Sequence, residues 1–221
     1  MRKFLRDNGL TVVMLTLFAL SFTGQVLTGH KEYNDDQTEH GRAEAGLGEY
    51  LTTGHFVEAT FENWESEFLQ MAAYVMLTVF LYQRGSSESK DPDKEEEVDR
   101  DPRESRDKKD APGPVRAGGL VLKLYENSLF IAFALLFLLS FALHAMGGHE
   151  EYNGDQREHG RPEVTVLGYV ASSRFWFESF QNWQSEFLSV AAIVLLTVWL
   201  RQKGSPESKP VDAPHSETGG G

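Results

Sequence analysis

Long apolar stretches alternate with strongly polar stretches along this chain. Two of the apolar stretches, Leu10–Leu27 and Leu129–Met146, contain no Asp, Glu, Lys or Arg. A helix needs roughly 20 residues to cross the hydrocarbon. Two other stretches, Phe68–Tyr82 and Phe187–Leu200, reach this length only if the aromatic residues before them are included. This pattern predicts an all-α membrane protein. We expect four transmembrane helices, over about residues 9–28, 62–82, 126–147 and 181–201.

The chain also contains one segment in two copies. The copy that begins at Leu5 returns at Leu124 without a gap, and its densest match is polar, because residues 30–42 return as residues 149–161. Two helices per copy give both copies the same orientation, so we expect a pseudo-two-fold axis along the membrane normal. The linker and tail contain few apolar residues, which predicts disorder. The predicted divisions are a first repeat (1–84), a cytoplasmic linker (85–119), a second repeat (120–203) and a cytoplasmic tail (204–221).

Charge predicts the topology. The net charge is −12, and acids are concentrated in the loop within the first repeat. Basic residues flank the outer ends of each predicted helix pair, at Arg2, Lys3, Arg6, Arg84, Arg116, Lys123, Arg201 and Lys203. Because basic residues collect on the cytoplasmic side, we expect both termini and the linker inside and the polar loops outside. The first apolar stretch has a copy in mid-chain, so we expect a retained helix and not a cleaved signal peptide.

Each polar loop carries paired histidines and several carboxylates. Divalent cations such as zinc bind nitrogen and oxygen donors of this kind, commonly three or four together. The candidate metal ligands are His30, Glu32, Asp36 and His40 in the first loop, and His149, Glu151, Asp155 and His159 in the second. Paired histidines could alternatively sense pH, since they titrate near physiological pH.

Local structure is a further explanation for the same residues. Asn34 and Gln37 have the spacing of a capping box, and Gly41 stands where a helix would end. This spacing predicts a short helix over about residues 35–40. A corresponding helix is expected over residues 154–159.

A second group of candidates lies at the start of the second and fourth predicted helices. Trp64 and Trp183 belong to an aromatic belt at the outer interface. Glu67 and Glu186 directly precede the apolar runs, and a carboxylate at membrane depth is a functional candidate. An acid in the first turn of a helix is also favoured by the helix dipole. Asn63 and Asn182 would then cap the two helices.

Three motifs occur twice, Asn-Trp-x-Ser-Glu-Phe-Leu, Gly-His-x-Glu-Tyr-Asn and Gln-x-Gly-Ser-x-Glu-Ser-Lys. In these motifs the chain resembles an uncharacterised family of small bacterial multi-pass membrane proteins, known as a domain of unknown function. The resemblance covers both repeats and excludes the linker. It implies a bacterial inner-membrane location and brings no activity, ligand or catalytic residue.

Three functional hypotheses follow. The first is a non-enzymatic membrane protein whose outer loops bind a divalent cation or sense pH. The second is a small transporter or channel that uses Glu67 and Glu186. The third is a scaffold that docks a cytoplasmic protein through the linker and the segments Gly85–Lys90 and Gly204–Lys209. Cysteine is absent, which excludes disulfides and thiolate metal sites, and there is no phosphate loop, dinucleotide motif or nucleic-acid patch. The expected partners are the lipid bilayer and, in a homo-oligomer, further copies of this chain.

Overall fold

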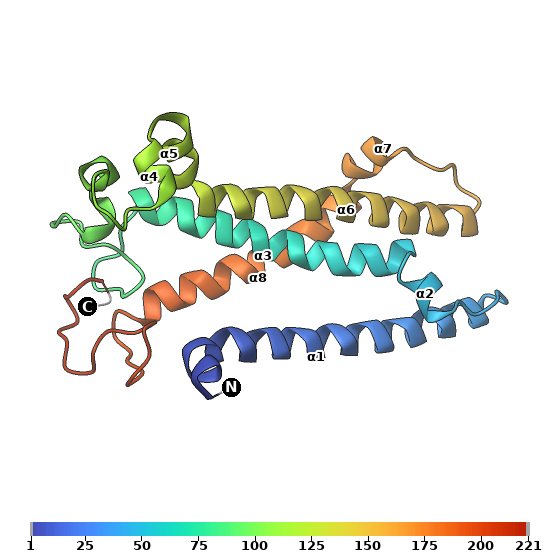
Figure 1. The fold of residues 1–221 in the computed structure, drawn as a ribbon. Helices are drawn as coiled ribbons and strands as arrows, with labels where there is room; N and C mark the ends of the chain where they lie inside the picture. The colour runs from blue at the N-terminus through green and yellow to red at the C-terminus, as the bar shows by residue number, and fades with distance from the viewer. Residues whose placement is uncertain (1, 220–221) are drawn as a thin grey trace. The chain divides into compact units, whose positions relative to one another are not determined.

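The computed structural model describes residues 2–219, so predictions for Met1, Gly220 and Gly221 lie outside the described residues. Within the described range there are eight α-helices, two 3-10 helices and no strand, which confirms the all-α prediction (Figure 1). The elements are α1 (Arg2–Glu39), α2 (Leu47–Tyr50), α3 (Gly54–Phe80), η1 (Glu97–Asp99), η2 (Pro102–Ser105), α4 (Gly113–Ala117), α5 (Gly119–Glu126), α6 (Ser128–Glu158), α7 (Val166–Val170) and α8 (Ser173–Leu196).

The chain divides into two compact units, and each unit contains parts of both repeats. Unit 1 consists of Met1–Phe61 and Ala142–Phe175, and unit 2 consists of Glu62–Phe141 and Trp176–Gly221. Unit 1 therefore holds both polar loops. Unit 2 holds the linker, the tail and most of the residues in α3 and α8.

Two helices in the described part of the chain, α1 and α6, are long and apolar enough to span a membrane. The predicted spans over residues 62–82 and 181–201 do not meet the same standard. In α3 the reason is the acidic first half, since Glu58, Glu62 and Glu65 precede Glu67 before the apolar run begins. Length and composition therefore support two of the four predicted membrane crossings.

Asparagine marks the start of the membrane-type helix in both repeats. Asn8 has non-helical backbone angles inside α1, φ −131° and ψ 16°, and Asn127 separates α5 from α6 with φ −112° and ψ 10°. The Asn8 side chain donates to the Phe4 carbonyl at 3.0 Å, and the Asn127 side chain donates to the Lys123 carbonyl at 2.8 Å. Each amide satisfies a carbonyl that the interrupted helix leaves open.

Both membrane-type helices continue through the residues that were expected to form separate short helices. α1 runs without interruption past Asn34 to Glu39, so the predicted helix start at residue 35 is wrong. The predicted stop is confirmed. Gly41 and Gly160 have φ of 71° and 64°, in the left-handed region that glycine tolerates at a helix end.

The helices α3 and α8 begin earlier than predicted. The Thr53 hydroxyl accepts from the Phe56 N–H at 3.3 Å, and the Ser172 hydroxyl accepts from the Phe175 N–H at 3.3 Å. Hydroxyl side chains in this position replace the missing helical partner of a first-turn N–H. The prediction that Asn63 and Asn182 cap these helices is wrong, because both asparagines lie inside them.

Short helical elements lie within the linker, whose composition predicts disorder. η1, η2 and α4 lie within residues 85–119. Ala111, Val115 and Leu122 form a small buried cluster where α4 packs on α5. Ala111 and Val115 of the linker thus bury apolar surface together with Leu122 of α5.

In unit 1, a buried tyrosine packs against a glycine in each repeat. Tyr50 is 1% exposed and Tyr169 is 0% exposed. A Cβ atom added at Gly29 would overlap the Tyr50 hydroxyl, and a Cβ atom at Gly148 would overlap the Tyr169 hydroxyl. A residue larger than glycine would therefore collide with the tyrosine at either position. Each tyrosine holds the short helix of its loop against the polar end of α1 or α6.

We predict that Gly148→Ala lowers the free energy of unfolding by about 1–3 kcal/mol, because the added methyl group overpacks a buried site. Thermal unfolding of the detergent-purified protein would measure this. Gly24→Ala is the matched control, because a Cβ at Gly24 meets nothing within 4 Å. Equal unfolding temperatures for Gly148→Ala and the parent would contradict the tyrosine–glycine packing.

Candidate functional site

A histidine and an asparagine fasten the first polar loop to α1. Asn34 donates to the Ala45 carbonyl at 3.0 Å and accepts from the Ala45 N–H at 2.8 Å. Nε2 of His30 lies 2.8 Å from the same carbonyl oxygen. The same Nε2 lies 3.0 Å from the Asn34 side-chain nitrogen, so the histidine contacts both groups of the bridge. The asparagine that resembled a helix cap is thus a bridge to a residue eleven positions further on.

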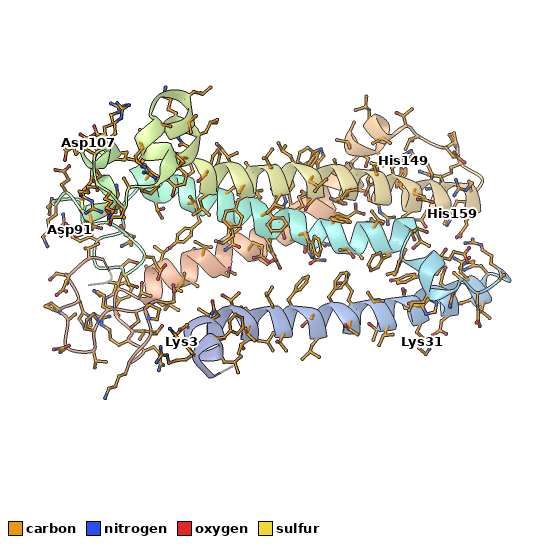
Figure 2. All side chains as sticks on the ribbon, viewed as in Figure 1. Lys3, Lys31, Asp91, Asp107, His149 and His159 are labelled. Carbon is orange, nitrogen blue, oxygen red and sulfur yellow. The ribbon has the colours of Figure 1, made fainter. Side chains whose placement is uncertain are left out.

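The second loop repeats this arrangement. Asn153 donates to the Val164 carbonyl at 3.0 Å and accepts from the Val164 N–H at 3.0 Å, while Nε2 of His149 lies 2.9 Å from that carbonyl. Figure 2 labels His149 on the polar part of α6. Nε2 of His30 and of His149 is therefore engaged with loop backbone. Both histidines have a structural role in holding the loops.

Two glycines let α3 and α6 approach each other closely within unit 1. A Cβ at Gly54 would lie 2.8 Å from the Gly147 carbonyl oxygen, and a Cβ at Gly147 would lie 2.6 Å from the Glu58 backbone nitrogen. Backbone atoms cannot move aside cheaply, so no larger residue fits. Small residues commonly allow helices to approach in this way. The crossing brings the first turn of α3 beside the acidic end of α6.

A cavity of about 280 Å³ lies at this crossing, between residues of both loops. Four of the predicted metal ligands line it, Glu32 and Asp36 from α1 and Glu151 and Asp155 from α6. The remaining acids in its wall are Glu150 and Glu158. Six carboxylates face only two arginines and one histidine in this lining, so the cavity carries a negative potential that favours cations.

Ion pairs join the two loops around this cavity. Arg42 of the first loop bonds to Glu158 at the end of α6. Nε2 of His40 lies 3.9 Å from the same carboxylate, and its Nδ1 lies 3.0 Å from the backbone oxygen of Asp36. In the second repeat, Nδ1 of His159 contacts the Asp155 backbone oxygen at 2.8 Å. The predicted convergence of the duplicated histidines is not seen, since none of the four belongs to the described cavity lining.

Among the described residues that line the cavity there is one histidine, His55, and it is not one of the predicted metal ligands. Its Nε2 lies 3.0 Å from the Glu32 carboxylate, and its Nδ1 lies 3.5 Å from the Tyr50 hydroxyl. The corresponding residue of the second repeat, Arg174, pairs with Asp155 at 2.8 Å. The replacement of histidine by arginine between the repeats was visible in the sequence. The role of this replacement became clear only from the carboxylate that each residue contacts, Glu32 for His55 and Asp155 for Arg174.

A buried histidine–glutamate pair was also missed. His144 is 0% exposed and Glu58 is 9% exposed, and each brings a potential ligand atom to within 4.8 Å of the other. The Phe175 ring stacks on the His144 ring with centroids 4.7 Å apart. The corresponding residue in the first repeat, Gln25, donates instead to the Thr60 hydroxyl at 3.2 Å. Buried ionisable groups are unusual unless they are paired.

In unit 2, polar contacts join α3 to α8. The Trp183 indole N–H donates to the fully buried Glu65 carboxylate at 3.0 Å, and Asn182 donates to Glu62. These contacts give Trp183 a hydrogen-bonding role beyond the predicted aromatic belt. Glu67 lies in α3 and is exposed, and Glu186 lies in α8 and is half-buried. Trp64 lies on the same helix as Glu62 and Glu65.

The fold and this site describe an all-helical protein with two helices suited to a membrane and an acidic cavity at their polar ends. The family described as Domain of unknown function (DUF6766) matches residues 1–220, so the chain belongs to this family. Neither the curated proteins nor the solved structures contain a match to this chain.

We predict that the imidazole of His40 titrates above its ordinary pKa of 6.5. The pKa is raised first by the hydrogen bond to the Asp36 backbone and then by the Asp36 charge. The resulting stabilisation is present below the unfolded pKa and is lost as pH rises through the folded pKa. In a histidine NMR titration, Asp36→Asn should move the midpoint down, while Glu44→Gln should leave it unchanged. A parent midpoint at or below 6.5 would exclude this electrostatic environment.

Proposed function

We propose that this protein is a non-enzymatic membrane protein whose outer polar end binds a divalent cation in the cavity of unit 1. One observation carries the proposal. Glu32 and Asp36 of the first repeat and Glu151 and Asp155 of the second line the same cavity. Carboxylates gathered from both repeats supply the donors and the negative potential that a cation requires.

The donor set favours a hard cation. His30 and His149 hold the loops through Nε2, so the cavity offers mainly carboxylate oxygens, with His55 as its one imidazole. Calcium, magnesium and manganese prefer such oxygen donors, whereas zinc prefers more nitrogen or sulfur. The proposed ligand is therefore a calcium-like or manganese-like ion. Protons compete for the same carboxylates, so binding should weaken as pH falls.

The proposed topology places the cavity outside the bacterial inner membrane, with both termini in the cytoplasm. It rests on the distribution of basic residues, which flank the opposite ends of the helices from the acidic loops. In this proposal α3 and α8 also cross the bilayer, their acidic first halves lying at the outer interface. Lipid and further copies of the chain are the proposed partners within the membrane.

We predict that the tag-free, detergent-purified protein binds manganese or calcium near neutral pH. The double variant Glu32→Gln, Glu151→Gln should bind at least about tenfold more weakly, because it removes one carboxylate from each repeat. Isothermal titration calorimetry, with elemental analysis after dialysis, would measure both proteins. The double variant Glu39→Gln, Glu44→Gln is the control, because it makes the same charge change at exposed residues outside the cavity lining.

A third variant separates ligands from structural residues. His30→Ala with His149→Ala should lower the unfolding temperature yet keep binding, since these imidazoles hold loop carbonyls. Equal binding by the parent and the Glu32, Glu151 variant would reject the cavity as the cation site. Loss of binding in the control variant as well would show that only the overall charge matters.

A second candidate function, transport through the membrane, is favoured by Glu67 and Glu186. The two carboxylates come from different repeats, and both belong to unit 2. A carboxylate next to an apolar helix segment is costly at membrane depth unless it binds a proton or a cation. In this candidate function the two acids would bind the transported proton or cation.

For this candidate, we predict a proton or cation flux in liposomes that contain the purified protein. Flux should fall at least about tenfold in the double variant Glu67→Gln, Glu186→Gln, because neutral amides remove the charge that attracts the ion. The control is Glu44→Gln with Glu163→Gln, two exposed acids of the loops. Equal flux in all three proteins, or no flux in the parent, would contradict the transport function.

A further inference from the structure

The Gly-Ser-x-Glu-Ser-Lys motif forms the same turn after α3 and after α8. Gly85 and Gly204 open the two turns with φ of 88° and 83°. The Ser89 hydroxyl accepts from the Gln83 N–H at 2.8 Å, and the equivalent contact in the second turn measures 2.9 Å. We call Gly85–Lys90 the first motif turn and Gly204–Lys209 the second. The repeated serines are therefore explained by the local fold of each turn.

The lysines that end the two turns hold different partners. Lys90 contacts the Asp99 carboxylate at 2.6 Å. Lys209 is 1% exposed and donates to the carbonyl oxygens of three tail residues. These carbonyls belong to Pro214, His215 and Glu217, at 3.2, 3.1 and 2.7 Å. An ammonium group has three N–H donors, so this cage satisfies all of them.

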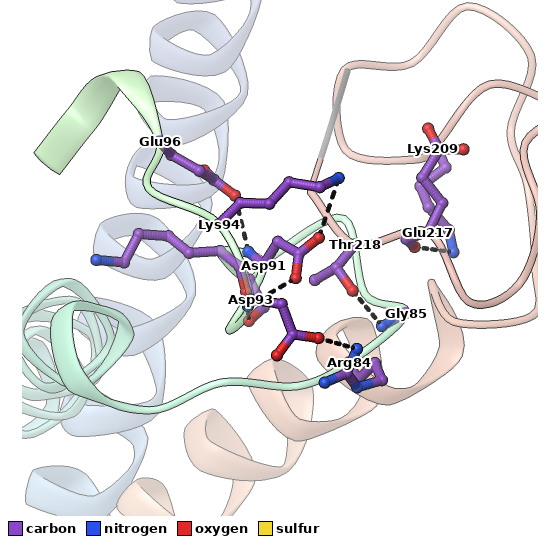
Figure 3. A network of polar contacts seen from close by, with 11 residues as sticks. Arg84, Gly85, Asp91, Asp93, Lys94, Glu96, Lys209, Glu217 and Thr218 are labelled. Atoms are coloured by element: carbon purple, nitrogen blue, oxygen red, sulfur yellow. Dashed lines mark hydrogen bonds and ion pairs between the residues drawn. The ribbon is translucent and has the colours of Figure 1, made fainter.

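The tail held by Lys209 returns to the first motif turn. The Gly85 N–H donates to the Thr218 hydroxyl at 2.8 Å, as Figure 3 shows. The Gly219 N–H donates to the Ser86 carbonyl at 2.9 Å. The Ser86 hydroxyl is fully buried and pairs with the Thr197 hydroxyl at 2.9 Å, just after α8 ends. These contacts cover the backbone of the first motif turn.

The tail also completes the end of α8. Arg201 donates to the carbonyls of Thr197, Val198 and Leu200 and reaches the Ala213 carbonyl at 3.3 Å. A basic side chain is favoured at a helix C-terminus, where it meets open carbonyls and the negative end of the dipole. Arg201 therefore links the helix end to the tail that Lys209 encloses.

We propose that residues 210–219 form a clasp that Lys209 keeps closed, and that the clasp joins the ends of α3 and α8 while covering the first motif turn. The ammonium group holds three carbonyls at once, so its loss releases the tail as one piece. Release would uncover Gly85 and Ser86, whose backbone groups the closed clasp occupies. The clasp is thus an intramolecular contact that controls access to the motif.

Hydrogen exchange of the full chain tests this proposal directly, since the Gly85 and Gly219 amides report closure. Lys209→Met removes the donors and keeps most of the side-chain volume. It should speed exchange in peptides covering 83–90 and 210–219 by about tenfold, because three charge-assisted hydrogen bonds are lost. Lys90→Met is the matched control, because Lys90 occupies the same place in the first turn and contacts Asp99 instead of the tail. It should leave 210–219 unchanged.

Peptides from the interior of α3 and α8 check that each variant is folded. If Lys209→Met does not fold, Thr218→Val removes the acceptor of the Gly85 N–H and should speed exchange in 83–90 alone. The clasp is refuted if residues 210–219 exchange at the unprotected rate in the parent. It is also refuted if Lys209→Met or Thr218→Val leaves the protection within about twofold of the parent.

Discussion

Unit 1 depends on the packing of one tyrosine ring against one glycine in each repeat. Tyr50 and Tyr169 lie where Gly29 and Gly148 leave room for a hydroxyl group, and both rings are almost completely buried. Burial of an aromatic ring supplies the apolar contact that these charged loops otherwise lack. The asparagine bridge to Ala45 can then form, because the loop is already held against the helix.

The loops held in this way determine the electrostatics of the cavity. The close crossing of Gly54 with Gly147 adds the acidic end of α6 to the carboxylates of α1. Arg42 compensates one of these acids and His55 contacts another. Negative charge remains in excess, which is acceptable only beside solvent or a cation. Protonation of these carboxylates would therefore lower the excess negative charge of the cavity.

The sequence was sufficient for elements whose cause is local. Apolar composition alone predicts the all-helical class, and the glycine stop at Gly41 follows from the chemistry of one turn. The role of Asn34 could not be predicted, because Asn-x-x-Gln looks the same in a helix cap and inside a helix that bonds to a distant loop. His55 and His144 were missed for a related reason. A single histidine has no diagnostic spacing, and its partners come from other helices.

The crossing at Gly54 and Gly147 has a consequence for the relationship between the two halves. The corresponding residues of the other repeat are Ser173 and Thr28, which carry the side-chain atoms that this crossing excludes. A dimer of two first halves or of two second halves would lack a matched glycine pair at this point. At this crossing the two halves are therefore complementary, because each contributes a glycine that its relative lacks.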